Sequence, residues 1–165
     1  MRRLSLILFV TLAVASCAYI VGTAGLLPSR VAVHFGGNGQ VNGSMPRDVY
    51  LLFTLALAGL FPVFIVASIA GLPLIMQRGV KLPNRAYWLA PPRRSETLVA
   101  VGAFGGWLGC LLTLFFGAMH YTILDANASA PPLLRAQLFY SVLGGFLVAV
   151  LSWQALFYAR FRTPH

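Results

Sequence analysis

The sequence predicts an all-α integral membrane protein with four transmembrane helices, and three observations carry that prediction. Of the 165 residues, 59% are hydrophobic and only 9% are charged, whereas a soluble domain carries about a quarter charged residues. The mean hydropathy is +0.81. The apolar residues also gather in long stretches that reach the length of about 20 residues needed to cross a bilayer. We therefore expect residues 1–165 to form a single membrane domain.

The expected spans cover about residues 4–27, 49–76, 98–121 and 133–158. Helices are favoured because the bilayer core offers no partner to an open backbone N–H or C=O group. A β-barrel would instead need short segments of alternating polarity. In the second span, Pro62 and Pro73 predict a bend or an early helix end.

The first span has a competing interpretation as a signal peptide. Arginines at positions 2 and 3 precede the apolar run, and Val-Ala-Ser-Cys at 14–17 would suit a bacterial lipoprotein cleavage site. Because the apolar run continues to Leu27, its length fits an uncleaved helix better than a short signal core. Cleavage before Cys17 stays the alternative.

The net charge of +9 predicts the orientation of the spans. Basic residues cluster before the first span, between the second and third, and after the fourth, whereas the loop 27–48 holds only two. The positive-inside rule then places both termini and the loop 77–96 in the cytoplasm, with the loops 27–48 and 120–132 on the other side. We expect a bacterial cytoplasmic (inner) membrane protein with the bilayer as its main partner. No nucleic-acid partner is expected, because the cations form neither a patch nor a motif.

Glycines recur at helical spacing in the third span and reappear in the fourth. Small residues four apart share one helix face and let another backbone approach closely. We interpret this face as packing within the chain, against the fourth or the first helix. A dimerisation face, or a contact with another membrane protein, is the alternative. The predicted helix-packing residues are Gly102, Gly105, Gly106, Gly109, Gly117 and Gly145.

Aromatic and basic residues alternate in the loop 77–96. Tyr and Trp commonly lie at headgroup depth, where Arg contacts lipid phosphate. We therefore interpret this segment as a lipid-interface belt, with a docking surface for a cytoplasmic partner as the alternative. The predicted belt residues are Arg85, Tyr87, Trp88, Arg93 and Arg94.

The loop 27–48 is the main polar segment outside the spans. Its sequence predicts a short strand followed by a tight turn. Its apolar positions 31, 33 and 35 alternate with 32 and 34, and the run Gly-Gly-Asn-Gly follows. We predict a hairpin-like loop that carries the recognition element. The candidate ligand-binding residues are His34, Phe35, Gly36, Gly37, Asn38 and Gly39.

Enzyme, transport and metal chemistry find little support. The centres of the spans hold no ionisable Asp, Glu, Lys, Arg or His, which argues against an ion-coupled transporter. No nucleophile elbow or phosphate-binding loop is present, so we expect no catalytic residue and no cofactor. A Zn or Cu site at His34, Asp48, His120 and Asp125, with Met45 and Met119 nearby, is the alternative to ordinary interfacial residues. Their spacing matches no metal motif, so we predict none. Cys17 and Cys110 are expected to be buried thiols rather than a disulfide.

Two segments carry a resemblance to a known family. Pro-Ser-Arg-Val-Ala-Val-His-Phe-Gly-Gly-Asn-Gly-Gln-Val-Asn-Gly at 28–43 resembles the signature of a bacterial membrane protein family of unknown function. That signature is also the N-terminal unit of SdpI-like (sporulation-delay immunity) proteins. The segment 82–97 resembles the cytoplasmic loop of small members of that family. The resemblance implies a signalling or immunity protein against a toxic peptide and implies no catalytic residue.

These observations predict a non-enzymatic, multi-pass protein that senses or binds a ligand or peptide at the outer face of the membrane. An accessory subunit of a larger membrane complex, docking through the glycine face, is the second reading. A small-molecule transporter or membrane enzyme is the third.

Overall fold

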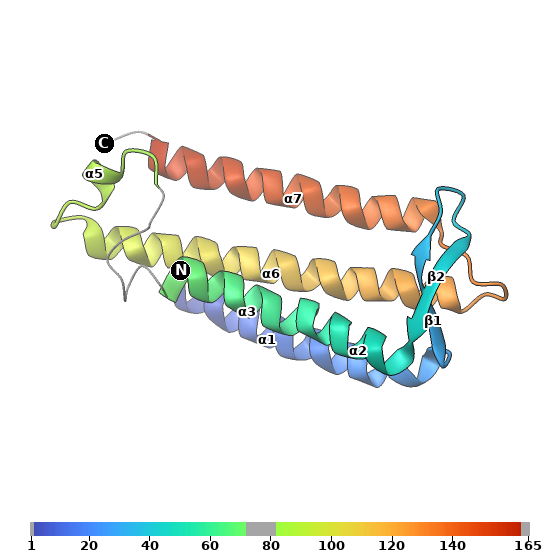
Figure 1. Ribbon diagram of the computed structural model, residues 1–165. Coiled ribbons are helices and arrows are strands. Elements are labelled where there is room, and N and C mark those ends of the chain that lie inside the picture. Colours follow the sequence, from blue (N-terminus) through green and yellow to red (C-terminus); the bar gives the residue numbers. More distant parts are fainter. Residues whose placement is uncertain (1, 72–81, 163–165) are drawn as a thin grey trace.

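The computed structural model describes residues 2–71 and 82–162. It is an elongated helical bundle with a two-stranded sheet across one end (Figure 1). We call this end the sheet end. The opposite end, where α1 (Arg2–Gly22) begins and α7 (Ala136–Arg162) ends, is called the terminal end.

Within the described part of the chain, four helical segments are long and apolar enough to cross a membrane, which is the predicted number of spans. The first joins α1 to a 3-10 turn, η1 (Ala24–Leu26). The second runs through α2 (Arg47–Leu55), η2 (Ala56–Leu60), α3 (Phe61–Val66) and η3 (Ala67–Gly71). The third is α6 (Arg94–Asn127) and the fourth is α7. Among the described residues between the second and third spans lies the helical turn α5 (Arg85–Trp88).

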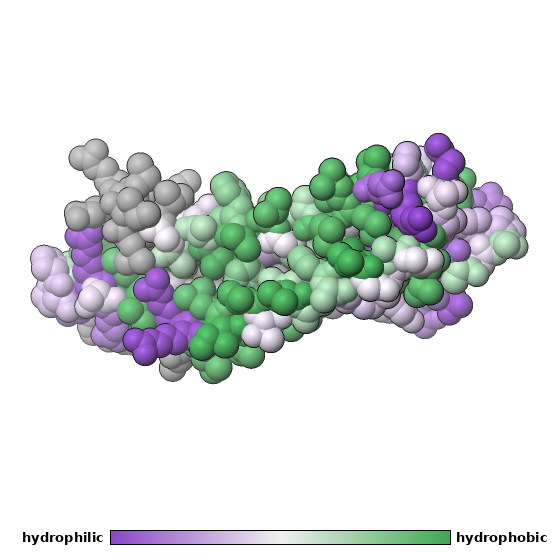
Figure 2. All heavy atoms as spheres, turned by 90° about the horizontal axis from the view of Figure 1, so that it is seen from below, coloured by the Kyte–Doolittle hydropathy of each residue, from purple (hydrophilic) through white to green (hydrophobic). Residues whose placement is uncertain are grey.

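The middle of the bundle is apolar on its surface. Figure 2 shows hydrophobic residues along the middle of the molecule and hydrophilic residues gathered at both ends. This distribution matches a bilayer core between two polar interfaces. By the length and composition of its helices, the protein is a multi-pass membrane protein.

The second span passes Pro62 without ending. Proline has no N–H to donate and its ring crowds the preceding turn. Here Pro62 lies in the first turn of α3, directly after the π-helical turn of η2, a local widening that accommodates such a residue. The prediction at Pro73, the last part of the predicted span 49–76, and the start of the loop 77–96 lie outside the described residues.

The glycine face of α6 packs against the first and second spans. A Cβ added at Gly106 would lie 2.6 Å from the Ser5 hydroxyl oxygen, and one at Gly109 would lie 2.5 Å from a Val66 methyl carbon. Neither position therefore has room for a side chain. Side chains of the first and second spans also lie close to three further glycines. These are Arg2 next to Gly102, Ile69 next to Gly105 and Ser16 next to Gly117.

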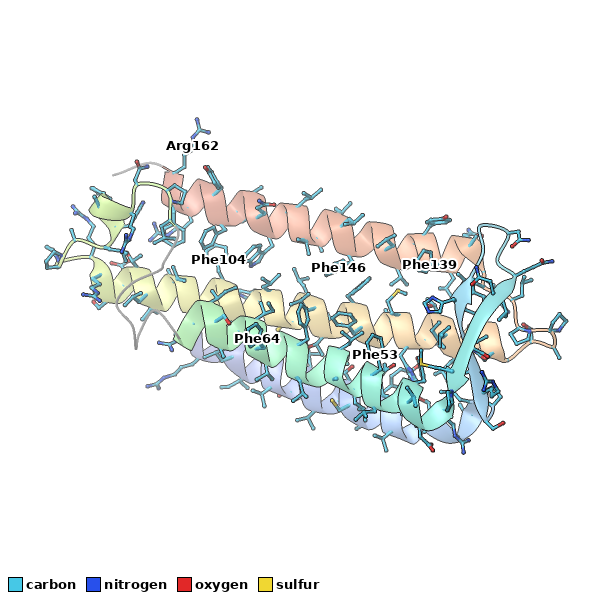
Figure 3. The ribbon with its side chains drawn as sticks, viewed as in Figure 1. Phe53, Phe64, Phe104, Phe139, Phe146 and Arg162 are labelled. Atoms are coloured by element: carbon cyan, nitrogen blue, oxygen red, sulfur yellow. The ribbon has the colours of Figure 1, made fainter. Side chains whose placement is uncertain are left out.

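The fourth span does not take part in this glycine packing, which corrects the expectation for Gly145. A Cβ added at Gly145 would meet no heavy atom within 4 Å. The face of α6 that looks toward α7 is aromatic instead, with Phe104 5.2 Å from Phe157 and Phe115 4.1 Å from Phe146 between ring centroids (Figure 3). Bulky rings hold α7 further from α6, so its glycine finds no close partner.

At the terminal end, Trp88 departs from the predicted belt. Its side chain is 6% exposed and packs edge-on against Phe161 of α7. Its indole N–H donates to the Phe161 carbonyl oxygen at 2.8 Å, and the Thr97 hydroxyl donates to the Trp88 carbonyl oxygen at 2.8 Å. Trp88 therefore belongs to the interior of this end. Of the other predicted belt residues, Arg85 and Arg93 are exposed, whereas Tyr87 and Arg94 are half-buried.

Candidate functional site beneath the hairpin

The predicted strand and turn form a β-hairpin. Strand β1 (Arg30–Phe35) pairs antiparallel with β2 (Val41–Pro46), and α2 begins at the next residue. The turn closes with a hydrogen bond from the Gly36 N–H to the Gln40 carbonyl oxygen at 2.8 Å. Gly39 has φ +77°, and a Cβ there would lie 2.6 Å from the Leu134 carbonyl oxygen. The turn therefore needs glycine at this position for both conformation and space.

The strict alternation predicted along β1 is broken. The pairing shifts between Ala32 and His34, so Val33 has no direct partner on β2. Val31 and Ala32 are both buried, whereas His34 is exposed. The His34 side chain packs over Gly43, where a Cβ would lie 3.1 Å from both the Cβ and the Cδ2 of His34.

The hairpin is hydrogen-bonded to the end of α6 and to the segment before α7. The Asn127 side chain accepts from the Ala32 N–H at 2.9 Å and donates to the Ala32 carbonyl oxygen at 3.0 Å. At the turn, the Leu134 N–H donates to the Gly39 carbonyl oxygen at 2.9 Å. These bonds satisfy backbone groups that an isolated hairpin would leave open.

A buried histidine joins three spans beneath the hairpin. His120 of α6 is 1% exposed. Its Nε2 lies 2.8 Å from the Thr23 hydroxyl oxygen, just after α1, and its Nδ1 lies 2.8 Å from the Tyr50 hydroxyl oxygen on α2. The Tyr19 ring meets the imidazole edge-on, with centroids 5.5 Å apart. We call these four side chains the histidine network.

The hydrogen bonds of the network define the tautomer of His120. The Thr23 hydroxyl donates its proton to the Tyr19 carbonyl oxygen at 2.7 Å. It must therefore accept the proton of Nε2, which leaves Nδ1 as an acceptor for the Tyr50 hydroxyl. Both ring nitrogens of a neutral His120 are satisfied in this arrangement, as a buried polar group requires.

One pocket of about 330 Å³ lies between the hairpin, α2 and α6, and we call it the span pocket. Val49 and Phe53, which line it, are exposed on α2. Its wall is mostly apolar, and its polar members are His34, Tyr50, Thr54 and His120. The apolar members are Val33, Met45, Val49, Phe53, Leu57, Phe116, Met119 and Ile123.

A second pocket of about 310 Å³ lies between the hairpin turn, α6 and the start of α7, and we call it the turn pocket. It brings together five of the six predicted ligand-binding residues. These are His34, Phe35, Gly36, Gly37 and Gly39. The sixth, Asn38, does not line the pocket, and its side-chain oxygen accepts from the Gln40 N–H at 3.1 Å. The wall is completed by Thr122, Phe139 and Tyr140 among others.

The residues weighed for a metal site are separated. His120 uses both nitrogens within the histidine network, and Asp125 is ion-paired with Arg135 at 3.2 Å. Across residues 2–71 and 82–162, no group of three His, Cys, Asp or Glu side chains converges. Cys17 and Cys110 are both free thiols.

Sequence reasoning missed the length of α6 and with it two residues of the site. The helix runs to Asn127 instead of ending near residue 121, so the predicted loop 120–132 is wrong in its first half. His120 and Asn127 look like loop residues because they are polar, yet each is paired with a distant segment. The available signal was their spacing: His120 and Asn127 are seven residues apart and so share one face of a continuing helix.

Comparison with known proteins gives one match. The family described as "Domain of unknown function (DUF1648)" matches residues 11–60, which include most of α1, the hairpin, α2 and η2. The chain is similar to that family over this segment, which supplies α1, the hairpin and the α2 wall of the span pocket. No curated protein and no solved structure matches the chain.

Proposed function

We propose that this protein is a non-enzymatic membrane protein that binds an apolar ligand in the span pocket. The observation that carries the proposal is the pocket itself. Its volume of about 330 Å³ lies within the range of small-molecule sites, which combine apolar walls with a few placed polar groups. Such a binding step is what a sensing protein requires.

The histidine network supports the proposal because it holds the walls of the pocket. His120 and Tyr50 both line the span pocket and are bonded to each other at 2.8 Å. Thr23 ties the same imidazole to the end of α1. A ligand that displaced any of these side chains would therefore act on three spans at once. Ligand binding could thereby shift the relative positions of these three spans.

The charge distribution supports an orientation with the sheet end outside the cytoplasm. Arginines in the first turn of α1, in and after α5, and in the last turn of α7 gather at the terminal end. The positive-inside rule assigns that end to the cytoplasm of a bacterial inner membrane. The span pocket would then open near the outer interface.

The resemblance to SdpI-like proteins extends the proposal to signalling or immunity. The resemblance is carried by residues 28–43. These residues include β1, the turn and the first part of β2, and the hairpin lines both pockets. A toxic peptide recognised at the outer face would meet this hairpin first. The immunity role rests on the resemblance, whereas the binding role rests on the pocket.

Native mass spectrometry of the protein released from nanodiscs tests the binding role. The wild type should retain a small molecule at one copy per chain. Leu57→Trp, which adds bulk to the wall of the span pocket, should lose it. Leu60→Trp is the matched control, because Leu60 is 72% exposed on the same span and does not line the pocket. Equal retention by both variants, or none by the wild type, would contradict the proposal.

A second candidate function is an accessory subunit, and α7 is the observation that favours it. The most apolar window of α7 is 0% buried in the chain, and a groove of about 530 Å³ runs between α1, α6 and α7. The glycine face is already covered by α1 and α3, so a partner would use α7 instead. Cysteine cross-linking from exposed Leu151, in a background lacking Cys17 and Cys110, should then capture one defined protein. Random cross-links would count against a partner.

A further inference from the structure

The span pocket and the turn pocket share a wall. Val33 and His34 of β1, with Met119 and Ile123 of α6, line both. The His34 ring makes no hydrogen bond to the described residues and is exposed between the two spaces. Met119 carries a flexible thioether chain that repacks easily around an occupant. One ligand can therefore contact both pockets across this wall.

The two pockets lie at different depths. The span pocket follows the second span from Val49 to Leu57, a rise of about 12 Å along a helix. It thus extends from the interface into the hydrocarbon. The turn pocket instead extends from Met119 and Thr122 of α6 to Gly36 and Gly37 of the hairpin turn, beyond the start of the second span. A ligand filling both would have one part at chain depth and one part at headgroup depth.

The two pockets also differ in chemistry. The turn pocket offers the backbone of the glycine turn, the His34 imidazole and the Tyr140 hydroxyl. None of the described residues that line either pocket is Asp, Glu, Lys or Arg. A polar group bound there would be held by hydrogen bonds, without a counter-charge. A formally charged head would meet no group of opposite charge among these lining residues.

We propose that the two pockets together bind one single-chain amphiphile with an uncharged, hydrogen-bonding head, of the monoacylglycerol class. The chain lies in the span pocket and the head lies in the turn pocket beside His34. The exposed rim at Val49 and Phe53 opens toward the bilayer, where such molecules already lie with this orientation. This inference rests on the proposed function and names the class of its ligand.

Methionine methyl NMR reads out this site directly. The chain has four methionines, of which Met45 and Met119 line the span pocket and Met119 also lines the turn pocket. Protein labelled with ¹³C at the methionine methyl groups is placed in nanodiscs and titrated with 1-monocaprin. Both methyl signals, assigned by Met→Leu variants, should shift and saturate. Because the chain passes from bilayer hydrocarbon into an apolar pocket, the Kd, expressed as a mole fraction in the bilayer, should change little from the eight- to the twelve-carbon chain.

Head recognition is tested by comparing ligands and variants. Decane, which has no head, and decyltrimethylammonium, which has a charged one, should each bind at least about tenfold more weakly than 1-monocaprin. Gly37→Val should remove this advantage, because Gly37 lines the turn pocket and a Cβ there meets no heavy atom within 4 Å, so the added side chain changes the wall without displacing its neighbours. Gly144→Val on α7 is equally unhindered, lies outside both pockets, and should bind like the wild type.

The outcomes separate this inference from the proposed function. Saturable shifts with an acetylated Leu-Ala-Leu amide peptide but not with 1-monocaprin would overturn the ligand class and leave the binding role intact. Equal affinity for 1-monocaprin and decane would likewise overturn head recognition. No shift with any of these compounds, together with no molecule retained in native mass spectrometry, would overturn both.

Discussion

The two ends of the bundle bury polar groups in different ways. At the terminal end, Trp88 and Thr97 donate to backbone carbonyl oxygens, and the rings of Trp88 and Phe161 fill the space between α5 and α7. At the sheet end, His120 of the third span is hydrogen-bonded to side chains of the first and second spans. Among the described residues, aromatic rings join α5 to α7 at the terminal end, whereas the histidine network lies beside a pocket at the sheet end. We interpret the first arrangement as stabilising and the second as the place of the proposed ligand.

The largest effect is expected from Trp88→Ala. Removing this buried ring leaves a cavity against Phe161 and removes a hydrogen bond. The free energy of unfolding should fall by about 3–5 kcal/mol, measured by unfolding in mixed detergent and SDS micelles. Trp107→Ala is the control: Trp107 is 44% exposed, so its loss should be clearly smaller. Similar losses for both variants would contradict the structural role assigned to the buried Trp88 ring.

The next effect is expected from His120→Ala. The Tyr50 hydroxyl would lose its acceptor in a buried site, so the free energy of unfolding should fall by about 1–3 kcal/mol. His34→Ala, an exposed histidine on the same wall, should leave stability unchanged while weakening ligand binding. If His34→Ala were the more destabilising of the two, the assignment of structural and recognition roles would be reversed.

A smaller effect is expected from Asn127→Ala. Both backbone groups of Ala32 would lose their partner, which should lower stability by about 1 kcal/mol. Hydrogen exchange at the hairpin amides should accelerate, whereas amides in the middle of α6 should exchange as in the wild type. Uniform acceleration would indicate that Asn127 supports the whole bundle and not the hairpin.

The smallest effect is expected from Glu96→Gln at the terminal end. Its carboxylate lies 3.9 Å from Arg160, and its side chain is largely exposed. Solvent-exposed pairs contribute less than about 1 kcal/mol, so the midpoint of unfolding should barely move. A loss as large as that of His120→Ala would mean that the terminal end also depends on polar contacts.

The spans and the hairpin were predictable because each follows from local sequence. Continuous apolar length predicts a span, and the glycine-rich turn after an alternating segment predicts a hairpin. The bonds that build the site join residues far apart in the chain, such as Thr23 to His120 and Ala32 to Asn127. Periodicity carries no information on such partners. For that reason polar residues on α6 were assigned to a loop.

The predicted belt failed at Trp88 for a related reason. Tryptophan between arginines is typical of a membrane interface, and nothing in the local sequence shows that the end of α7 returns to cover it. The structure places Phe161, which is 0% exposed, directly against the indole. A ring that would have lain in the headgroups is therefore part of the interior.

Photo-crosslinking in membranes of expressing cells tests the central claim, occupancy of the span pocket, most directly. A benzoyl-phenylalanine replaces either Phe53, which lines the pocket and is 56% exposed, or Phe64, which is 66% exposed on the same span but does not line the pocket (Figure 3). We expect one defined small-molecule adduct at position 53 and only mixed bulk-lipid adducts at position 64. The same mixed adducts at both positions would contradict it.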